Sequence, residues 1–263
     1  MKTIHPHTVR LSEARPDLSP SASRRSKNNS EPILRNSIFV THTPAIREAE
    51  AEGVILGIKK ILIETRSRID VCFFGNFDLG DGPFGRTEWY QEQALMIRER
   101  GAGRQANVRI IDRLLREEPY QKNNPHFDVM IVDHDLTSGD PENNFAYGYA
   151  NYPNYIVSVA RFRQRFPNID SRNVALAVTS AHEMGHLFGL TSRNYNIGSS
   201  GYKKGHCNGE SGPCLMEQVD VDDSRTIEEQ TEILIDRVHW LCDDCLGEAA
   251  ARRDHLEKNA VIW

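Results

Sequence analysis

The sequence predicts an α/β fold, and three observations support this expectation. From about residue 33 onward, short apolar segments typical of strands alternate with segments whose apolar residues have helical spacing. One long helical segment carries the run H-E-M-G-H. Four of the five cysteines lie in the last quarter of the chain. We therefore expect a mixed, twisted sheet, a helix that carries the functional site, and a small C-terminal subdomain fastened by the cysteines.

The N-terminal segment differs in composition from the rest of the chain. Residues 1–32 are rich in Ser, Pro, Arg and Asn and contain few apolar residues. Such a segment cannot bury enough apolar surface to offset the entropy of ordering, so we expect a disordered arm. Residues 33–263 are expected to form a single domain, with an upper part over 33–189, a lower part over 190–246 and a tail over 247–263.

The first half of the domain alternates between strand and helix patterns. The run I-F-V-T-H predicts a strand, residues 45–63 a long helix, and residues 69–74 a second strand. A loop rich in Gly and Asp follows over 75–86, and two helices are expected over 88–100 and 106–117.

The second half contains the central strand and the helix of interest. The apolar run F-D-V-M-I-V-D predicts a strand that is buried on both faces. N-F-A-Y-G-Y-A and Y-I-V-S-V-A-R-F predict two more strands joined by a turn at 151–154. Asp170 or Ser171 is expected to cap the next helix, which carries H-E-M-G-H. A further amphipathic helix is expected over I-L-I-D-R-V-H-W-L, directly before C-D-D-C.

Charge and hydropathy bear on the expected partners. The formal net charge is −5, which argues against nucleic acid and anionic membranes as partners. The sequence contains no run of eighteen apolar residues and no secretory signal at its N-terminus. We expect a cytoplasmic monomer.

The H-E-M-G-H run predicts a metal-dependent hydrolase site. His182 and His186 are one helical turn apart, so both imidazoles project from one face and can share a metal ion, with the carboxylate of Glu183 beside them. A catalytic zinc needs a third protein ligand. Gly189 would let the chain leave the helix in a left-handed turn and place that ligand downstream, where His206 is the nearest histidine.

Other interpretations of these residues stay open. The H-E-M-G-H run could be a solvated helix face, and His206 an ordinary loop histidine. In that case Ser192, Asn194 or Asp220 could be the third ligand, or none could exist. The isolated histidines His126, His134 and His239 are expected at the surface or satisfied in the core.

The cysteines predict a second metal site. Cys207, Cys214, Cys242 and Cys245 cluster in a chain with no export signal, which favours metal binding over disulfides. A redox C-x-x-C pair is the alternative. Such a pair usually starts a helix, whereas C-D-D-C is expected to follow the end of one and contains acidic residues. Cys72, in an apolar segment, is expected to be a buried, inert thiol.

Taken together, these runs resemble a known family. H-E-M-G-H-L-F-G-L, then H-C, C-L-M and C-D-D-C, is similar to the pattern of the archaemetzincins, zinc metallopeptidases of the metzincin clan, over about residues 127–245. The upstream runs D-L-T, N-F-A-Y-G-Y-A and V-S-V-A-R-F are also similar to that family's pattern. The resemblance implies two Zn²⁺ per chain. The catalytic zinc would be held by His182, His186 and His206, and the structural zinc by Cys207, Cys214, Cys242 and Cys245.

The resemblance also implies a fold and an activity. The fold would be metzincin-like, and Met216 would lie in the methionine turn below the catalytic metal. Glu183 would act as general base and a zinc-bound water as nucleophile in the hydrolysis of a peptide or protein substrate. An extended substrate could pair with an edge strand near residues 144–149. The alternative is a non-catalytic zinc-binding or interaction protein that retains the fold.

The spacing departs from the family pattern at one point. The third histidine of the family comes six residues after the second, at the position of Ser192, whereas His206 follows His186 by twenty residues. Residues 191–205 are rich in Gly, Ser and Asn and are expected to be an insertion, either a solvated loop or a lid over the cleft. The spacings from Cys207 to Cys214 and from Met216 to Cys242 are also longer than in the family.

Overall fold

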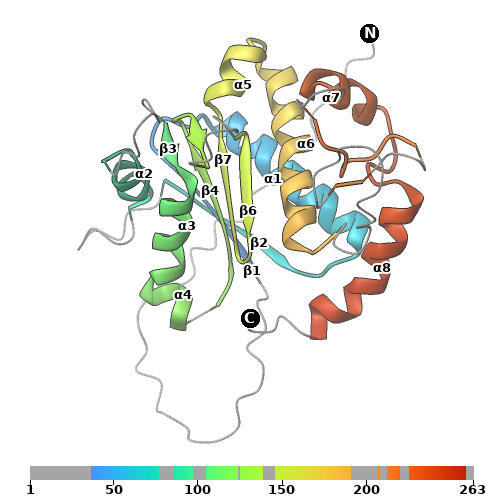
Figure 1. Cartoon of the computed structure of the whole chain (residues 1–263), viewed down its shortest axis with the longest axis horizontal. Helices are drawn as coiled ribbons and strands as arrows, with labels where there is room; N and C mark the ends of the chain where they lie inside the picture. Colours follow the sequence, from blue (N-terminus) through green and yellow to red (C-terminus); the bar gives the residue numbers. More distant parts are fainter. Residues whose placement is uncertain are drawn as a thin grey trace, which may run out of the picture. The chain divides into compact units, whose positions relative to one another are not determined.

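A five-stranded mixed sheet with helices on both faces organises the chain (Figure 1). The computed structural model describes residues 37–76, 86–96, 105–123, 125–138, 146–190, 206–207, 212–219 and 225–258. These residues fall in one compact unit, Pro32–Trp263. The predicted arm over 1–32 and the predicted insertion over 191–205 lie outside the described residues.

Strands and helices alternate in the first half of the chain, four strands then follow in succession, and four helices come last among the described residues. The strands are β1 (Ser37–His42), β2 (Asp70–Gly75), β3 (Ala106–Asn107), β4 (Phe127–Val132), β5 (Leu136–Thr137), β6 (Gly148–Asn151) and β7 (Asn154–Ser158). The helices are α1 (Glu48–Thr65), α2 (Thr87–Met96), α3 (Val108–Glu117), α4 (Pro119–Asn123), α5 (Ala160–Arg165), α6 (Ile169–Leu187), α7 (Ile227–Ile235) and α8 (Asp243–Lys258).

The sheet has the strand order β2-β1-β4-β7-β6. The first four strands are parallel to one another, and β6 pairs with β7 in the antiparallel direction. In the described part of the chain β6 is therefore an edge strand of this sheet. The short strands β3 and β5 form a separate parallel pair.

The central strand β4 separates two hydrophobic cores. Val129 and Ile131 belong to the core that contains the apolar residues of α1 and α6, and Met130 and Val132 to the core that contains those of α2 and α3. All six residues of β4 are buried, which confirms the predicted burial on both faces. In Figure 1, α1 and α6 lie on one side of the sheet and α2 and α3 on the other.

Two glycines of α1 allow it to pack closely against α6. A Cβ atom at Gly57 would lie 2.1 Å from the carbonyl oxygen of Ala177, and one at Gly53 would lie 2.8 Å from that of Asn173. Because the neighbouring atoms belong to the backbone of α6, they cannot move aside without shifting the helix. The absence of side chains at these positions therefore sets the separation of the two helices.

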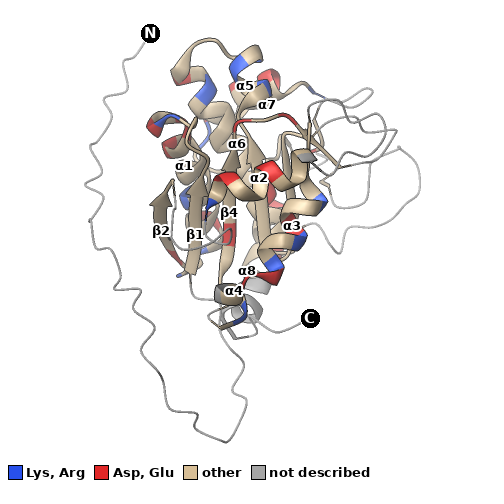
Figure 2. Ribbon diagram, turned by 90° about the vertical axis from the view of Figure 1, so that its left-hand side faces the viewer, with Lys and Arg blue, Asp and Glu red and all other residues tan. Residues whose placement is uncertain are grey.

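The surface helices carry charges of both signs. In Figure 2, α2 carries acidic residues only, whereas α3 carries both acidic and basic residues. Among the described residues, no helix combines the length and apolar character that a membrane span requires.

The structure corrects several predicted boundaries. The run V-A-R-F is not part of a strand, because β7 ends at Ser158, whose hydroxyl accepts a hydrogen bond from the Ala160 amide at the start of α5. The predicted helix over 233–241 is wrong beyond Ile235, where α7 ends. The predicted tail over 247–263 begins inside α8.

Substitution of Gly57 by Ala tests the α1–α6 contact. The added methyl group would meet the backbone of α6, and overpacking of this kind costs about 1–3 kcal/mol. We expect the free energy of unfolding, measured by chemical denaturation, to fall by at least ~2 kcal/mol. Gly247 in α8 is a matched control, because a Cβ atom there meets nothing within 4 Å. Gly247→Ala should raise stability by roughly 0.5–1 kcal/mol. Equal effects of the two substitutions would contradict the proposed contact.

Candidate metal centre

Helix α6 carries the H-E-M-G-H run, and particular residues at each end determine where it begins and ends. The side chain of Asn168 accepts hydrogen bonds from the amides of Asp170 and Ser171, so the predicted cap at Asp170 or Ser171 is wrong by two or three residues. Asp170 lies instead in the first turn, where its charge complements the helix dipole.

The other end of α6 turns sharply after the second histidine. Gly189 has φ = 73°, a left-handed conformation that an L-residue rarely adopts. The Gly189 amide donates to the carbonyl of His186 and the Leu190 amide to that of Gly185, which together form a Schellman motif. The chain therefore leaves the helix within one turn of His186.

The structure brings three histidines together. The Nε2 atoms of His182 and His186 are 3.0 Å apart, and the ring centroid of His206 lies 5.3 Å from that of His182 and 5.0 Å from that of His186. One ligand nitrogen from each of the three residues lies within 4.8 Å of the others. Two nitrogens bound to one tetrahedral zinc would be roughly 3.3 Å apart, so this set could hold such an ion after small adjustments. We call these three residues the histidine site.

A backbone carbonyl determines the tautomer of His182. The Nδ1–H of His182 donates to the carbonyl of Leu215 over 2.7 Å. Nε2 therefore carries the lone pair and faces the other histidines. Leu215 has no chemical signature in the sequence, and sequence reasoning did not identify it.

Burial keeps His182 and His186 neutral. Burial, followed by the neighbouring His206, lowers the pKa of His182 to about 4, although the bond to Leu215 opposes this shift. Burial and the two neighbouring histidines lower the pKa of His186 to about 2. At neutral pH both rings are therefore unprotonated and can act as metal ligands.

Glu183 lies between the histidines and the edge strand. Burial raises its pKa to about 7, while a hydrogen bond from the amide of Ala150 in β6 lowers it. A Cβ atom at Gly148 would lie 3.0 Å from Cγ of Glu183 and 3.0 Å from the ring of Tyr155. Gly148 therefore leaves the space that the Glu183 side chain occupies, and sequence reasoning missed this role. A carboxyl group with a pKa near neutrality can both accept and return a proton.

Met216 packs beneath the helix that carries the histidines. Its side chain is fully buried, and its sulfur would lie 2.5 Å from a Cβ atom at Gly185. Gly185 is the glycine of H-E-M-G-H, so it admits Met216 directly below the turn that separates His182 from His186. The carbonyl of Met216 also accepts a hydrogen bond of 2.8 Å from the Cys207 amide.

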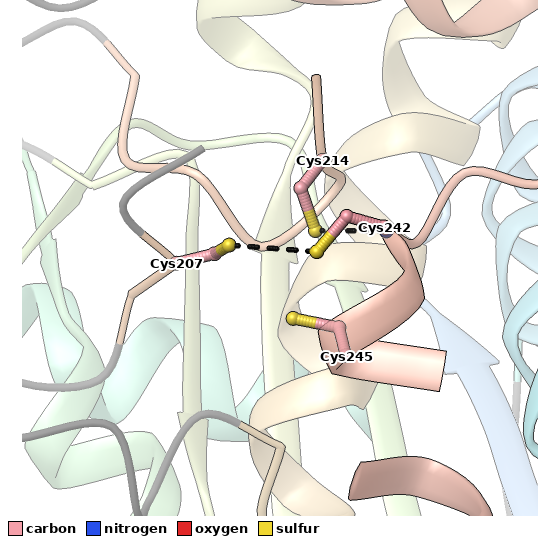
Figure 3. A group of neighbouring side chains, drawn as sticks. All are labelled: Cys207, Cys214, Cys242 and Cys245. Carbon is pink, nitrogen blue, oxygen red and sulfur yellow. Dashed lines mark hydrogen bonds between the residues drawn. The ribbon is translucent and has the colours of Figure 1, made fainter. Parts of the chain in front are cut away.

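The four clustered cysteines form a second group, which we call the cysteine site. Figure 3 shows Cys207, Cys214, Cys242 and Cys245 pointing toward one another. All four are at most 4% exposed, and the sulfurs of Cys207 and Cys242 are 3.7 Å apart. Sulfurs that share one tetrahedral zinc are roughly 3.8 Å apart. The four-thiol set is therefore suited to a closed zinc site.

The cysteine site corrects one argument from the sequence. C-D-D-C does not follow directly on a helix: Cys242 immediately precedes α8, and Cys245 lies in its first turn. The sequence argument against a redox pair, that C-D-D-C follows the end of a helix, was therefore wrong. The metal interpretation instead depends on the convergence of four sulfurs. It also agrees with the pKa of Cys245, which contact with the neighbouring thiols and burial raise, in contrast to the lowered pKa of a reactive thiol.

A buried carboxylate anchors the segment before α8. Glu64 of α1 accepts hydrogen bonds from the amides of Trp240 (2.7 Å) and Leu241 (3.0 Å). These two amides have no helical partner at this point of the chain, and Glu64 holds the backbone that presents Cys242. Nothing in the sequence pattern indicated this contact.

The remaining sequence candidates lie elsewhere. His126 is buried with its Nε2 2.9 Å from Asp128, His134 is partly buried, and His239 is exposed. Cys72 is only half-buried, and burial followed by the charge of Asp70 raises the pKa of its thiol. Ser192, Asn194 and Asp220 lie outside the described residues.

Comparison with solved structures identifies the fold. The chain is similar to the crystal structure of archaemetzincin from Methanopyrus kandleri, with a TM-score of 0.53 and 18% sequence identity over 83% of this chain and 95% of that one. It is also similar to a zinc-dependent peptidase from Methanocorpusculum labreanum, with a TM-score of 0.51 and 16% identity over 81% of this chain and 99% of that one. No protein-family model and no curated sequence matches the chain. The chain therefore has the archaemetzincin fold, which confirms the predicted fold class and, at the level of fold, the predicted resemblance.

A double-mutant cycle tests the packing of Met216 under α6. Gly185→Ala should lower the free energy of unfolding by about 1–3 kcal/mol, because the added methyl group overlaps the Met216 sulfur. In a Met216→Ala background the same substitution should cost far less, since the space has been vacated. Chemical denaturation of the four proteins gives the coupling energy. Additive effects would show that the two residues are not in contact.

Proposed function

We propose that this chain, which has the fold of archaemetzincins, is a zinc-dependent metallopeptidase that hydrolyses peptide bonds in a peptide or protein substrate. One observation carries the proposal: three imidazoles converge beside a carboxyl group whose pKa lies near neutrality. The two similar structures, one named archaemetzincin and the other a zinc-dependent peptidase, support the same activity.

The donor atoms fit two zinc ions of different kinds. The histidine site supplies three nitrogen ligands and leaves a fourth position for water or substrate, as catalytic zinc sites do. The cysteine site supplies four thiols and leaves no open position, as structural zinc sites do. Bound in the histidine site, zinc supplies Lewis-acid chemistry, lowering the pKa of water and polarising a carbonyl group.

Glu183 would move the proton during hydrolysis. Its carboxylate would accept a proton from the attacking water molecule and return it to the nitrogen of the leaving amine. The hydrogen bond from the Ala150 amide holds the carboxylate beside the histidines, and Gly148 leaves room for it. The residue thus has the position and the pKa that a general base requires.

The edge strand β6 offers a place for an extended substrate. The Tyr147 carbonyl accepts a hydrogen bond from the Ser158 amide. Along β6, the backbone N–H and C=O groups of every second residue therefore point toward β7, and those of the residues between them point away from β7. Ala150 is one of these, and its amide reaches Glu183. A peptide paired with the outward groups of β6 would bring its backbone next to the proposed base. This strand lies at Gly148–Asn151, slightly later than the predicted edge near 144–149.

Replacement of Glu183 by Gln tests the mechanism. The amide oxygen of Gln can still accept the Ala150 hydrogen bond, but it cannot accept a proton. We expect the hydrolysis of a peptide mixture, followed by mass spectrometry, to fall by at least ~100-fold. Zinc content and the circular dichroism spectrum should be unchanged. Near-wild-type hydrolysis by the variant would rule out Glu183 as the base, and a folded, zinc-loaded wild-type chain that cleaves nothing would favour the non-catalytic alternative.

The metal content provides a separate test. Elemental analysis of the purified protein should give two zinc ions per chain, and His206→Ala should reduce this number to one by weakening the histidine site. The Cys72→Ser variant is the control and should retain both ions. One zinc per chain in the wild-type protein would contradict the two-site proposal.

A further inference from the structure

The two sites share a short piece of backbone. His206 belongs to the histidine site, and Cys207, the next residue, belongs to the cysteine site. One peptide unit therefore joins a ligand of each site. The Cys207 amide donates to the Met216 carbonyl, so this unit is also paired with the segment that passes under α6.

The same segment supports the histidine site in two further ways. The Leu215 carbonyl accepts the hydrogen bond that determines the tautomer of His182, and Met216 fills the space below Gly185. Both residues directly follow Cys214, a member of the cysteine site. Residues 206–207 and 212–217 thus supply a ligand, an orienting carbonyl and a packing contact to the histidine site, together with two thiols of the cysteine site.

The other two thiols belong to a separate framework. Cys242 and Cys245 lie at the start of α8, and Glu64 of α1 holds the backbone just before them. Contacts between the two halves include the bond from the Leu215 amide to the Trp240 carbonyl (2.7 Å) and that from the Cys242 amide to the Cys214 sulfur (3.4 Å). A metal ion among the four sulfurs would fasten residues 206–207 and 212–217 to a framework that also includes α1, the helix against which α6 packs.

We infer that metal binding at the cysteine site assembles the histidine site, so that the two sites bind metal cooperatively. This inference rests on the proposed function only in taking the histidine site as a zinc site. Once the cysteine site is loaded, His206, the Leu215 carbonyl and Met216 are already ordered, and the second ion does not have to order them. Because such coupling is reciprocal, loading of the histidine site strengthens the cysteine site by the same factor.

The direct test removes the half of the cysteine site that lies on α8. Cys242→Ser/Cys245→Ser leaves residues 206–217 unchanged in sequence. In competition with a chelator of known affinity, Zn²⁺ should bind the histidine site of this variant ~10- to 100-fold more weakly than in the wild-type chain. Cys72→Ser is the matched control, since it removes a cysteine outside both sites, and its affinity should equal that of the wild type. An unchanged affinity in the double variant would overturn the inference.

The reciprocal test applies even if the double variant does not fold. His182→Ala disables the histidine site and leaves every cysteine in place. Co²⁺ bound by thiolates has a charge-transfer absorption that reports the cysteine site alone. The affinity of the cysteine site for Co²⁺ should be ~10- to 100-fold lower in His182→Ala than in the wild-type chain with its histidine site loaded. Equal affinities would overturn the coupling. Both tests measure metal affinity, so failure of the inference is distinguishable from failure of the proposed peptidase activity, which only the hydrolysis assay addresses.

Discussion

The close packing of α6 on α1 is the contact on which the rest of the structure depends. Gly53 and Gly57 bring the two helices so close that the backbone of α6 occupies the space of a missing side chain. One face of α6 is thereby held against the core, and the H-E-M-G-H run is presented between the edge strand and the segment around Met216. Any change in the helix separation would move both histidines and Glu183 together.

Buried carboxylates at opposite ends of α1 fix other elements relative to this helix. Near its start, the fully buried Glu50 binds Arg163 of α5 and Arg172 of α6. Near its end, Glu64 binds the backbone before α8. A buried carboxylate that loses its partners is costly, so each of these contacts strongly favours one arrangement. Helix α1 therefore relates the histidine-bearing helix to the cysteine-bearing helix, although it contributes no ligand to either site.

The residues proposed to react differ from the residues that hold them in position. The groups proposed to bind the catalytic metal and to move the proton are few: three imidazoles and one carboxylate. Their tautomer and position are determined by neighbours that take no part in the proposed reaction. The Leu215 carbonyl orients His182, and Gly148 leaves the space for Glu183. Burial then lowers the pKa values of His182 and His186 and raises that of Glu183, which leaves these two imidazoles neutral and brings the carboxyl pKa close to 7.

The sequence by itself determined those features that depend on local spacing. His182 and His186 share a face because a helix repeats every 3.6 residues, and the apolar run of β4 indicated a strand buried on both sides. The types of ligand, nitrogen in one set and sulfur in the other, could also be read from the residues. Only the tertiary structure decided which distant residues contact the histidines and the cysteines. It brought His206 next to α6 although twenty residues separate it from His186, placed C-D-D-C at the start of α8, and positioned Leu215, Glu64 and Gly148 as supporting residues. The supporting contacts of Leu215, Glu64 and Gly148 join residues far apart in the chain through backbone atoms or the absence of a side chain, and neither leaves a periodic signal in the sequence.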